Sequence, residues 1–134
     1  NLTYPLAGSF RGDPSGLYAG LRDGSRAGYG GLVFDGAHWL LSFSPELFVA
    51  LSGGEAKVKP MKGTRPRMAD PVADAAMAAD LGASVKDRAE NLMIVDLMRN
   101  DLSRVAEAGS VRVDAPFAVE SYPTVHQMVS TVRA

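Results

Sequence analysis

A long helical segment lies between two groups of short β-type runs, and this order restricts the fold to a few classes. Ser84 precedes a helix predicted over about residues 85–106, with Asp87 at N3 in the capping-box position, and Gly109 is expected to end it. The middle of the helix, residues 92–98, is apolar nearly all round. We therefore expect it to be buried against a sheet.

Runs rich in Val, Leu and aromatic residues surround the helical part and are typical of strands. The predicted strands are residues 2–6, 28–34, 39–43, 47–51 and 56–58 before it, and 111–119 and 125–132 after it. Asp35-Gly36 and Gly53-Gly54 are hairpin-type turns, so the early runs suggest one antiparallel meander. A meander, then helices, then further strands indicates the α+β class.

Two further helices begin with an aspartate followed by a proline. Asp13 and Pro14 occupy the N-cap and N1 positions of a short helix predicted over about 14–22. Asp70-Pro71 repeats the signal before an alanine-rich helix that should stop near Gly82.

Length and charge exclude several classes of protein. The chain has 134 residues, a net charge of −1 and no cysteine, which excludes a disulfide scaffold and a thiolate metal site. The charge gives no global field for nucleic acid or acidic membranes, and no apolar run approaches the roughly 20 residues of a membrane span. The cytoplasm is the default compartment. The start at Asn1, without methionine or signal pattern, suggests a piece that begins inside a strand.

Residues 57–67 hold five cations on a segment with two prolines and one glycine. Lys59 and Arg65 each precede a proline and should be extended. Gly63 would let backbone N–H groups approach a ligand, and Lys62 is central to the run, so one interpretation is a site for a small polyanion. The commoner alternative is a solvated basic loop. A nucleic-acid groove is less expected, because no aromatic residues interleave the charges.

Asp87 and Glu90 are three residues apart, so on a helix both carboxylates project from one face. Such a pair could hold Mg²⁺, which takes one or two protein carboxylates and keeps several waters. The alternative for Asp87 is a purely structural cap beside Ser84. Farther along the same helix, Asp96 can reach Arg99 or Asn100, and Asp101 can reach Arg104, which we interpret as a structural polar network rather than a catalytic relay.

Four segments resemble the signatures of chorismate-utilising enzymes, a family that includes anthranilate, isochorismate, salicylate and aminodeoxychorismate synthases. They are residues 44–46, 60–67, 87–101 and 121–134, and the resemblance runs from Asn1 to Ala134. It implies that residues 1–134 are a partial chorismate-binding domain, an antiparallel sheet packed with helices. Lys62 resembles the lysine of aminodeoxychorismate synthases, whereas anthranilate synthases usually have alanine there.

The resemblance implies amination of chorismate to 4-amino-4-deoxychorismate, a step toward para-aminobenzoate and folate, with ammonia from a glutamine amidotransferase partner. Lys62 would add to ring C2 while the C4 hydroxyl leaves, and ammonia would then enter at C4 and expel the lysine. The attacking amine must be neutral, which desolvation or neighbouring cations such as Arg65 would favour. Glu46 matches the acid that protonates the departing hydroxyl.

The remaining site residues follow from the same resemblance. Glu90, with Asp87 as a second candidate, matches a ligand of the Mg²⁺ cofactor, and the metal would hold a substrate carboxylate. Gly63, Thr64 and Arg67 would bind or line the substrate pocket.

Two departures from the family pattern affect these expectations. Gln127 occupies the position of a family histidine, and His126 comes one residue early, which in a strand means the opposite face. The family domain is also considerably longer, so the isolated chain should hold half a metal site and be inactive. Alternatives are an anthranilate synthase-like enzyme and a non-catalytic fragment of the same fold; a nucleic-acid module would show strongly salt-dependent binding, and we expect none.

Overall fold

The computed structural model describes residues 3–25 and 28–134. The chain divides into two compact units, Asn1–Pro45 and Glu46–Ala134. Within the described residues, no helix combines the length and apolarity that crossing a membrane requires.

The first unit holds α1 (Pro14–Ser25) and a hairpin of β1 (Tyr29–Phe34) and β2 (Trp39–Ser44). Asp13 caps α1 as predicted, since its carboxylate accepts the N–H groups at positions 15 and 16. The strand predicted for residues 2–6 is wrong for residues 3–6, which are irregular, and residue 2 lies outside the described residues. Pro5 in the middle of that run has no N–H to donate to a neighbouring strand.

In the second unit, α2 (Pro71–Ala83) and α3 (Val85–Ser103) begin where the capping signals predict. The Asp70 carboxylate accepts the N–H of the third residue of α2, and the Ser84 hydroxyl accepts the N–H of Asp87. The prediction that α3 extends to residue 106 is wrong, because the chain tightens into a turn after Ser103. Gly109, at φ 83°, lies in the turn that follows.

The second unit contains a five-stranded antiparallel sheet. Its strands are β3 (Leu47–Ser52), β4 (Glu55–Lys59), β5 (Met61–Pro66), β6 (Arg112–Ser121) and β7 (Val125–Arg133). β6 pairs along almost the whole of β7, so β4 and β5 share the other edge of β7. They are joined at Pro60, whose carbonyl accepts the N–H of Ser130 at 3.1 Å. β3 continues the sheet beyond β4.

The α+β class is confirmed, but the single meander is not. β1 and β2 form a sheet of their own, while β3 and β4 belong to the five-stranded sheet. Turn residues such as Asp35-Gly36 and Gly53-Gly54 determine that two neighbouring runs pair. They carry no information about which sheet the resulting hairpin joins.

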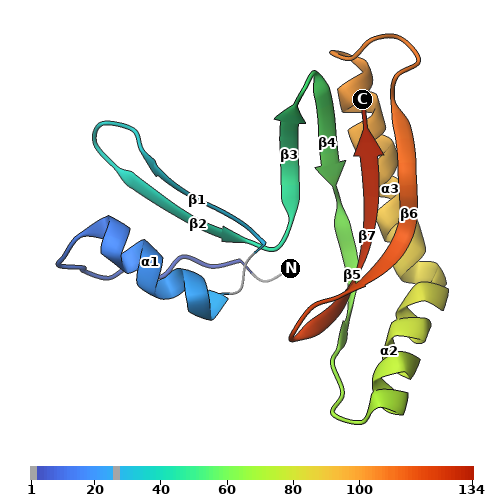
Figure 1. The fold of residues 1–134 in the computed structure, drawn as a ribbon, viewed down its shortest axis with the longest axis horizontal. Helices are drawn as coiled ribbons and strands as arrows, with labels where there is room; N and C mark the ends of the chain where they lie inside the picture. Colours follow the sequence, from blue (N-terminus) through green and yellow to red (C-terminus); the bar gives the residue numbers. More distant parts are fainter. Residues whose placement is uncertain (1–2, 26–27) are drawn as a thin grey trace. The chain divides into compact units, whose positions relative to one another are not determined.

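The helices α2 and α3 cover one face of the five-stranded sheet, with α3 running behind β6 and β7 (Figure 1). The core between α3 and the sheet consists of Val58, Val95, Leu102 and Val132. Only one face of α3 is buried: Met93 is 63% exposed and Leu97 49%. The expectation that residues 92–98 are buried against a sheet therefore holds for part of the segment: Val95 packs in the core, whereas Met93 and Leu97 remain largely exposed.

Candidate active site

The central part of β5 bulges where it passes β7. The paired residues on either side of the irregularity are Met61 with Val129 and Thr64 with Gln127. Two residues of β5, Lys62 and Gly63, therefore lie opposite the single residue Met128. Bulges of this kind are common beside active sites, where they redirect a side chain. The residue that the sequence singled out as the nucleophile stands in such a bulge.

Position 63 needs a glycine for two reasons, its backbone conformation and the close packing around it. Its φ is 86°, which an L side chain rarely adopts, and a Cβ there would lie 2.9 Å from Cβ of Asp87 and 2.9 Å from Cδ1 of Leu81. The bulge is therefore pressed against the helices at the α2–α3 junction.

Glu46 joins the same part of the sheet from the residue preceding β3. Its Oε1 accepts the backbone N–H of Met61 at 2.9 Å. Met61 is the residue before Lys62, and adjacent Cα atoms are about 3.8 Å apart. The carboxyl group and the lysine predicted to work together are thus brought to one end of β5.

The basic run of residues 57–67 is not a solvated loop, because it forms β4, Pro60 and β5. Lys59 and Arg65 are extended, as their positions before proline predict. Three of the five cations have carboxylate partners: Lys59 with Glu120 at 2.8 Å, Arg65 with Asp80 at 2.6 Å and Arg67 with Asp74 at 2.8 Å. Within residues 3–25 and 28–134, no ion pair is formed by Lys57 or Lys62.

The two acids of α3 have different surroundings. The hydrogen bond with Ser84, helped by Arg65 at 3.2 Å, holds the pKa of Asp87 below its ordinary value. Glu90 is 47% exposed, and among the residues that the structure describes its ion pair is with Lys86 at 3.7 Å. Glu90 fits the need of Mg²⁺ for an oxygen ligand at a partly hydrated site. Asp87 fits less well, since protein donors already hold it.

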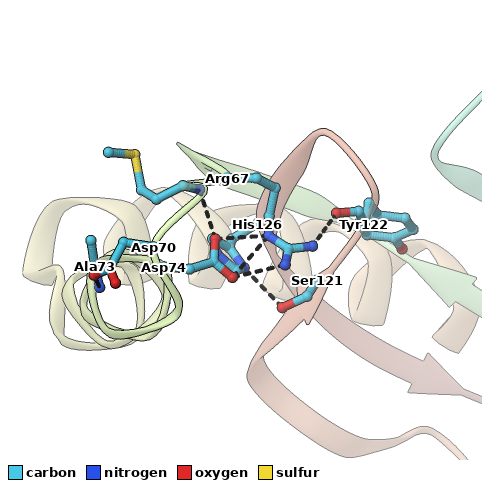
Figure 2. Close-up of polar contacts among 8 residues, drawn as sticks. Arg67, Asp70, Ala73, Asp74, Ser121, Tyr122 and His126 are labelled. Atoms are coloured by element: carbon cyan, nitrogen blue, oxygen red, sulfur yellow. Dashed lines mark hydrogen bonds and ion pairs between the residues drawn. The ribbon is translucent and has the colours of Figure 1, made fainter.

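Arg67 belongs to a polar network that ties the start of α2 to the β6–β7 hairpin (Figure 2). Its Nε and Nη2 donate to both oxygens of Asp74, and its Nη1 donates to the carbonyl of Tyr122 at 2.7 Å. The hydrogen bonds from Arg67, then those from the Met68 N–H and His126, hold the pKa of Asp74 far below its usual range. The guanidinium predicted to bind substrate thus has a structural task.

His126 is 2% exposed and lies between Asp74 and Ser121. Its Nε2 is 3.0 Å from the Asp74 carboxylate and its Nδ1 is 2.8 Å from the Ser121 hydroxyl. A carboxylate only accepts, so Nε2 donates its hydrogen to Asp74, and Nδ1 forms the contact with the Ser121 hydroxyl.

Gln127, the next residue, turns to another partner: its Oε1 accepts from the Thr64 hydroxyl at 3.0 Å. His126 and Gln127 therefore engage different groups, as the alternation of a strand predicts.

Sequence reasoning missed the partners that come from distant segments. Asp74, Ser121, Asn91 and Ser130 all form side-chain hydrogen bonds across the unit. A polar residue inside an apolar run, such as Asn91 or Ser130, was the available signal, because a buried polar group needs a partner. Of the two partners predicted for Asp96, Arg99 is the one it contacts, at 3.1 Å, and the pair is exposed rather than buried.

Comparison with known proteins shows the family to which the chain belongs. The family model described as chorismate binding enzyme matches residues 1–134. Aminodeoxychorismate synthase component 1 of Klebsiella aerogenes is 48% identical over 134 residues, which cover 100% of this chain and 30% of that protein. Aminodeoxychorismate synthase of Streptomyces pristinaespiralis is 54% identical over 134 residues, covering 98% and 18%. The crystal structure of anthranilate synthase component I from Streptococcus pneumoniae TIGR4 superimposes with a TM-score of 0.74 at 30% identity, covering 93% and 27%.

Proposed function

Because this chain belongs to the family of chorismate binding enzymes, we propose that it supplies one side of an aminodeoxychorismate synthase active site. The reaction converts chorismate and ammonia to 4-amino-4-deoxychorismate, toward para-aminobenzoate and folate, and a glutamine amidotransferase partner provides the ammonia. The chain spans 30% of the length of its Klebsiella relative. The activity therefore belongs to a complete domain, to which this chain contributes the lysine, the acid and one metal ligand.

The observation that carries the proposal is the hydrogen bond between Glu46 and the N–H of Met61, 2.9 Å long. It holds a carboxyl group beside the residue that precedes Lys62. Lys62 itself stands in a bulge and has no carboxylate partner in the described part of the chain.

In the proposed reaction, the neutral Lys62 amine forms a bond to C2 of chorismate. The ring double bonds shift, the C4–oxygen bond breaks, and the hydroxyl leaves as water with a proton from Glu46. Ammonia then bonds to C4 and the C2–nitrogen bond breaks, which returns Lys62 as a free amine. Lysine is thus regenerated, and the balance is one ammonia in and one water out.

Glu90 would hold Mg²⁺ in the complete domain, with waters and residues from outside this chain as the other ligands. When bound, the metal supplies a Lewis acid for a substrate carboxylate. Asp87 is proposed to act by orienting the first turn of α3 and balancing Arg65. Gly63 and Thr64 are proposed to line the pocket, and Arg67 to contribute positive charge at its border from its fixed place on Asp74.

The test compares Lys62→Ala and Lys62→Arg in the complete protein, with products identified by mass spectrometry. Arginine keeps the charge and most of the length but stays protonated, so it cannot attack. We expect both variants to lose aminodeoxychorismate formation while wild type accumulates a mass adduct on Lys62 under limiting ammonia. Aminodeoxychorismate formed at the wild-type rate by Lys62→Ala would refute the covalent role. Anthranilate as the main product of the wild type would favour the anthranilate synthase alternative.

A further inference from the structure

We infer that Asn91 is a positioning residue that fixes the metal-binding turn of α3 relative to the bulge carrying Lys62. The inference rests on the proposed function, because it assigns Asn91 a task in placing Glu90. Asn91 follows Glu90 directly in α3, but its side chain turns the other way, into the sheet, where none of its surface is exposed. A buried amide needs partners for both its ends.

Both partners of Asn91 lie on β7. Its Nδ2 donates to the carbonyl of Met128 at 3.4 Å, and its Oδ1 accepts from the Ser130 hydroxyl at 2.5 Å. Met128 and Ser130 are themselves fully buried. One side chain of α3 therefore holds two positions of the central strand at once.

Met128 is the residue opposite the bulge of Lys62 and Gly63. A bulge disrupts the ladder of backbone hydrogen bonds locally. The amide of Asn91 thus forms a hydrogen bond with β7 at the point where β5 departs from regular pairing. Movement of this contact would change the distance between the helix turn bearing Glu90 and the strand bearing Lys62.

Ser130 extends the same connection to a second bulge, in β6. Ala115 pairs with Thr131 and Ala118 with Val129, so residues 116 and 117 lie opposite Ser130. The Ser130 hydroxyl accepts the N–H of Phe117 at 3.0 Å, and Phe117 has a φ of 56°, unusual for a residue with a side chain. The Phe117 ring in turn lies 4.7 Å from the guanidinium of Arg88 in α3. The helix is therefore anchored at both neighbouring bulges.

A purely structural role predicts a different outcome from a positioning role. Leucine has nearly the shape of asparagine and would fill the buried site without either hydrogen bond. If Asn91 serves only packing, Asn91→Leu keeps metal affinity. If Asn91 sets the direction of Glu90, metal affinity falls even when the protein stays folded, as for other groups that orient a metal ligand.

The experiment uses the complete protein and measures Mg²⁺ binding by isothermal titration calorimetry without substrate, together with the KM for chorismate. We expect Asn91→Leu to weaken Mg²⁺ binding about tenfold to a hundredfold. Ser130→Ala, which removes one of the two contacts, should weaken it less. Asn100→Ala, an exposed asparagine of the same helix, is the matched control and should bind like the wild type.

Folded Asn91→Leu and Ser130→Ala proteins that bind Mg²⁺ like the wild type would overturn the inference. If Asn91→Leu does not fold, a Ser130→Ala protein that binds Mg²⁺ with wild-type affinity is enough to overturn the inference. Glu90→Gln separates the two proposals: if it leaves Mg²⁺ binding unchanged, the assignment of Glu90 as a ligand fails, and the role of Asn91 fails with it. Loss of binding in Glu90→Gln with none in Asn91→Leu refutes the positioning role alone.

Discussion

Gly63 lies against Asp87 so closely that a methyl group on its Cα would be 2.9 Å from the Cβ of that aspartate. Gly63 belongs to β5 and Asp87 to the first turn of α3. The contact joins the strand of the proposed nucleophile directly to the helix of the proposed metal ligand. It leaves no room for a side chain on the strand.

Replacement of Gly63 by alanine should destabilise the protein in two ways. The left-handed backbone costs about 1–3 kcal/mol for a residue with a Cβ, and overpacking against Asp87 and Leu81 adds about 1–3 kcal/mol. Gly109→Ala is the control, because its φ of 83° is similar and nothing lies within 4 Å of its Cβ position. Urea denaturation measures both. Equal losses in the two variants would show that the close packing at Gly63 costs nothing.

The folding stability of the protein should depend on pH through Asp74. Its pKa is lowered in the fold, chiefly by Arg67, so its contribution is complete above the ordinary carboxyl value of about 4 and is lost as the pH falls below it. We therefore expect the urea midpoint of the wild type to exceed that of Asp74→Asn clearly at pH 6 and by less at pH 3. Asp101→Asn, at an exposed position of α3, should follow the wild type at both pH values. If the difference in urea midpoint between wild type and Asp74→Asn is as large at pH 3 as at pH 6, the lowered pKa of Asp74 is not the source of the stability.

Leu81 should be the most sensitive apolar position of α2. It is fully buried between the helices and β5, so Leu81→Ala should cost about 2–5 kcal/mol. Val72→Ala, in the same helix but 78% exposed, should change stability by less than about 0.5 kcal/mol. Thermal and urea unfolding of the two variants provide the comparison, and a small loss for Leu81→Ala would mean that the α2–β5 contact is loose.

The 134 residues alone should bind chorismate and Mg²⁺ weakly. The proposed site takes further ligands from outside this chain, so the isolated chain offers only part of the groups that would hold either ligand. Calorimetric titration of the isolated chain, beside the complete protein, measures the difference. Tight binding of both ligands by the isolated chain would show that its site is already sufficient.

Local signals predicted the local structure well. Asp70 and Ser84 cap their helices as expected, because a capping residue and the N–H groups it accepts are neighbours in sequence. The interpretation of residues 57–67 as a basic loop failed, since the carboxylates that neutralise Lys59 and Arg67 come from β6 and α2. Charge density in a sequence does not reveal such partners.

Some features of the candidate site were likewise predictable from the sequence, and others were not. The motif predicted which residues to examine, Glu46 and Lys62 among them, and the fold brings the backbone next to Lys62 to the Glu46 carboxylate. The bulge at Lys62 was not predictable, because it depends on the register of β5 on β7, which are separated by two helices and a strand. The Asn91–Ser130 contact depends on the same long-range register.

The position of β7 has a consequence for how this segment is made. β7 is the last strand in sequence, yet β4, β5 and β6 all pair with it. While a ribosome synthesises the segment, the β3–β4 hairpin and the helices can form early, but the sheet cannot close until β7 has emerged. Until then β4 and β5 have an open edge, and a nascent chain in that state is exposed to association with others.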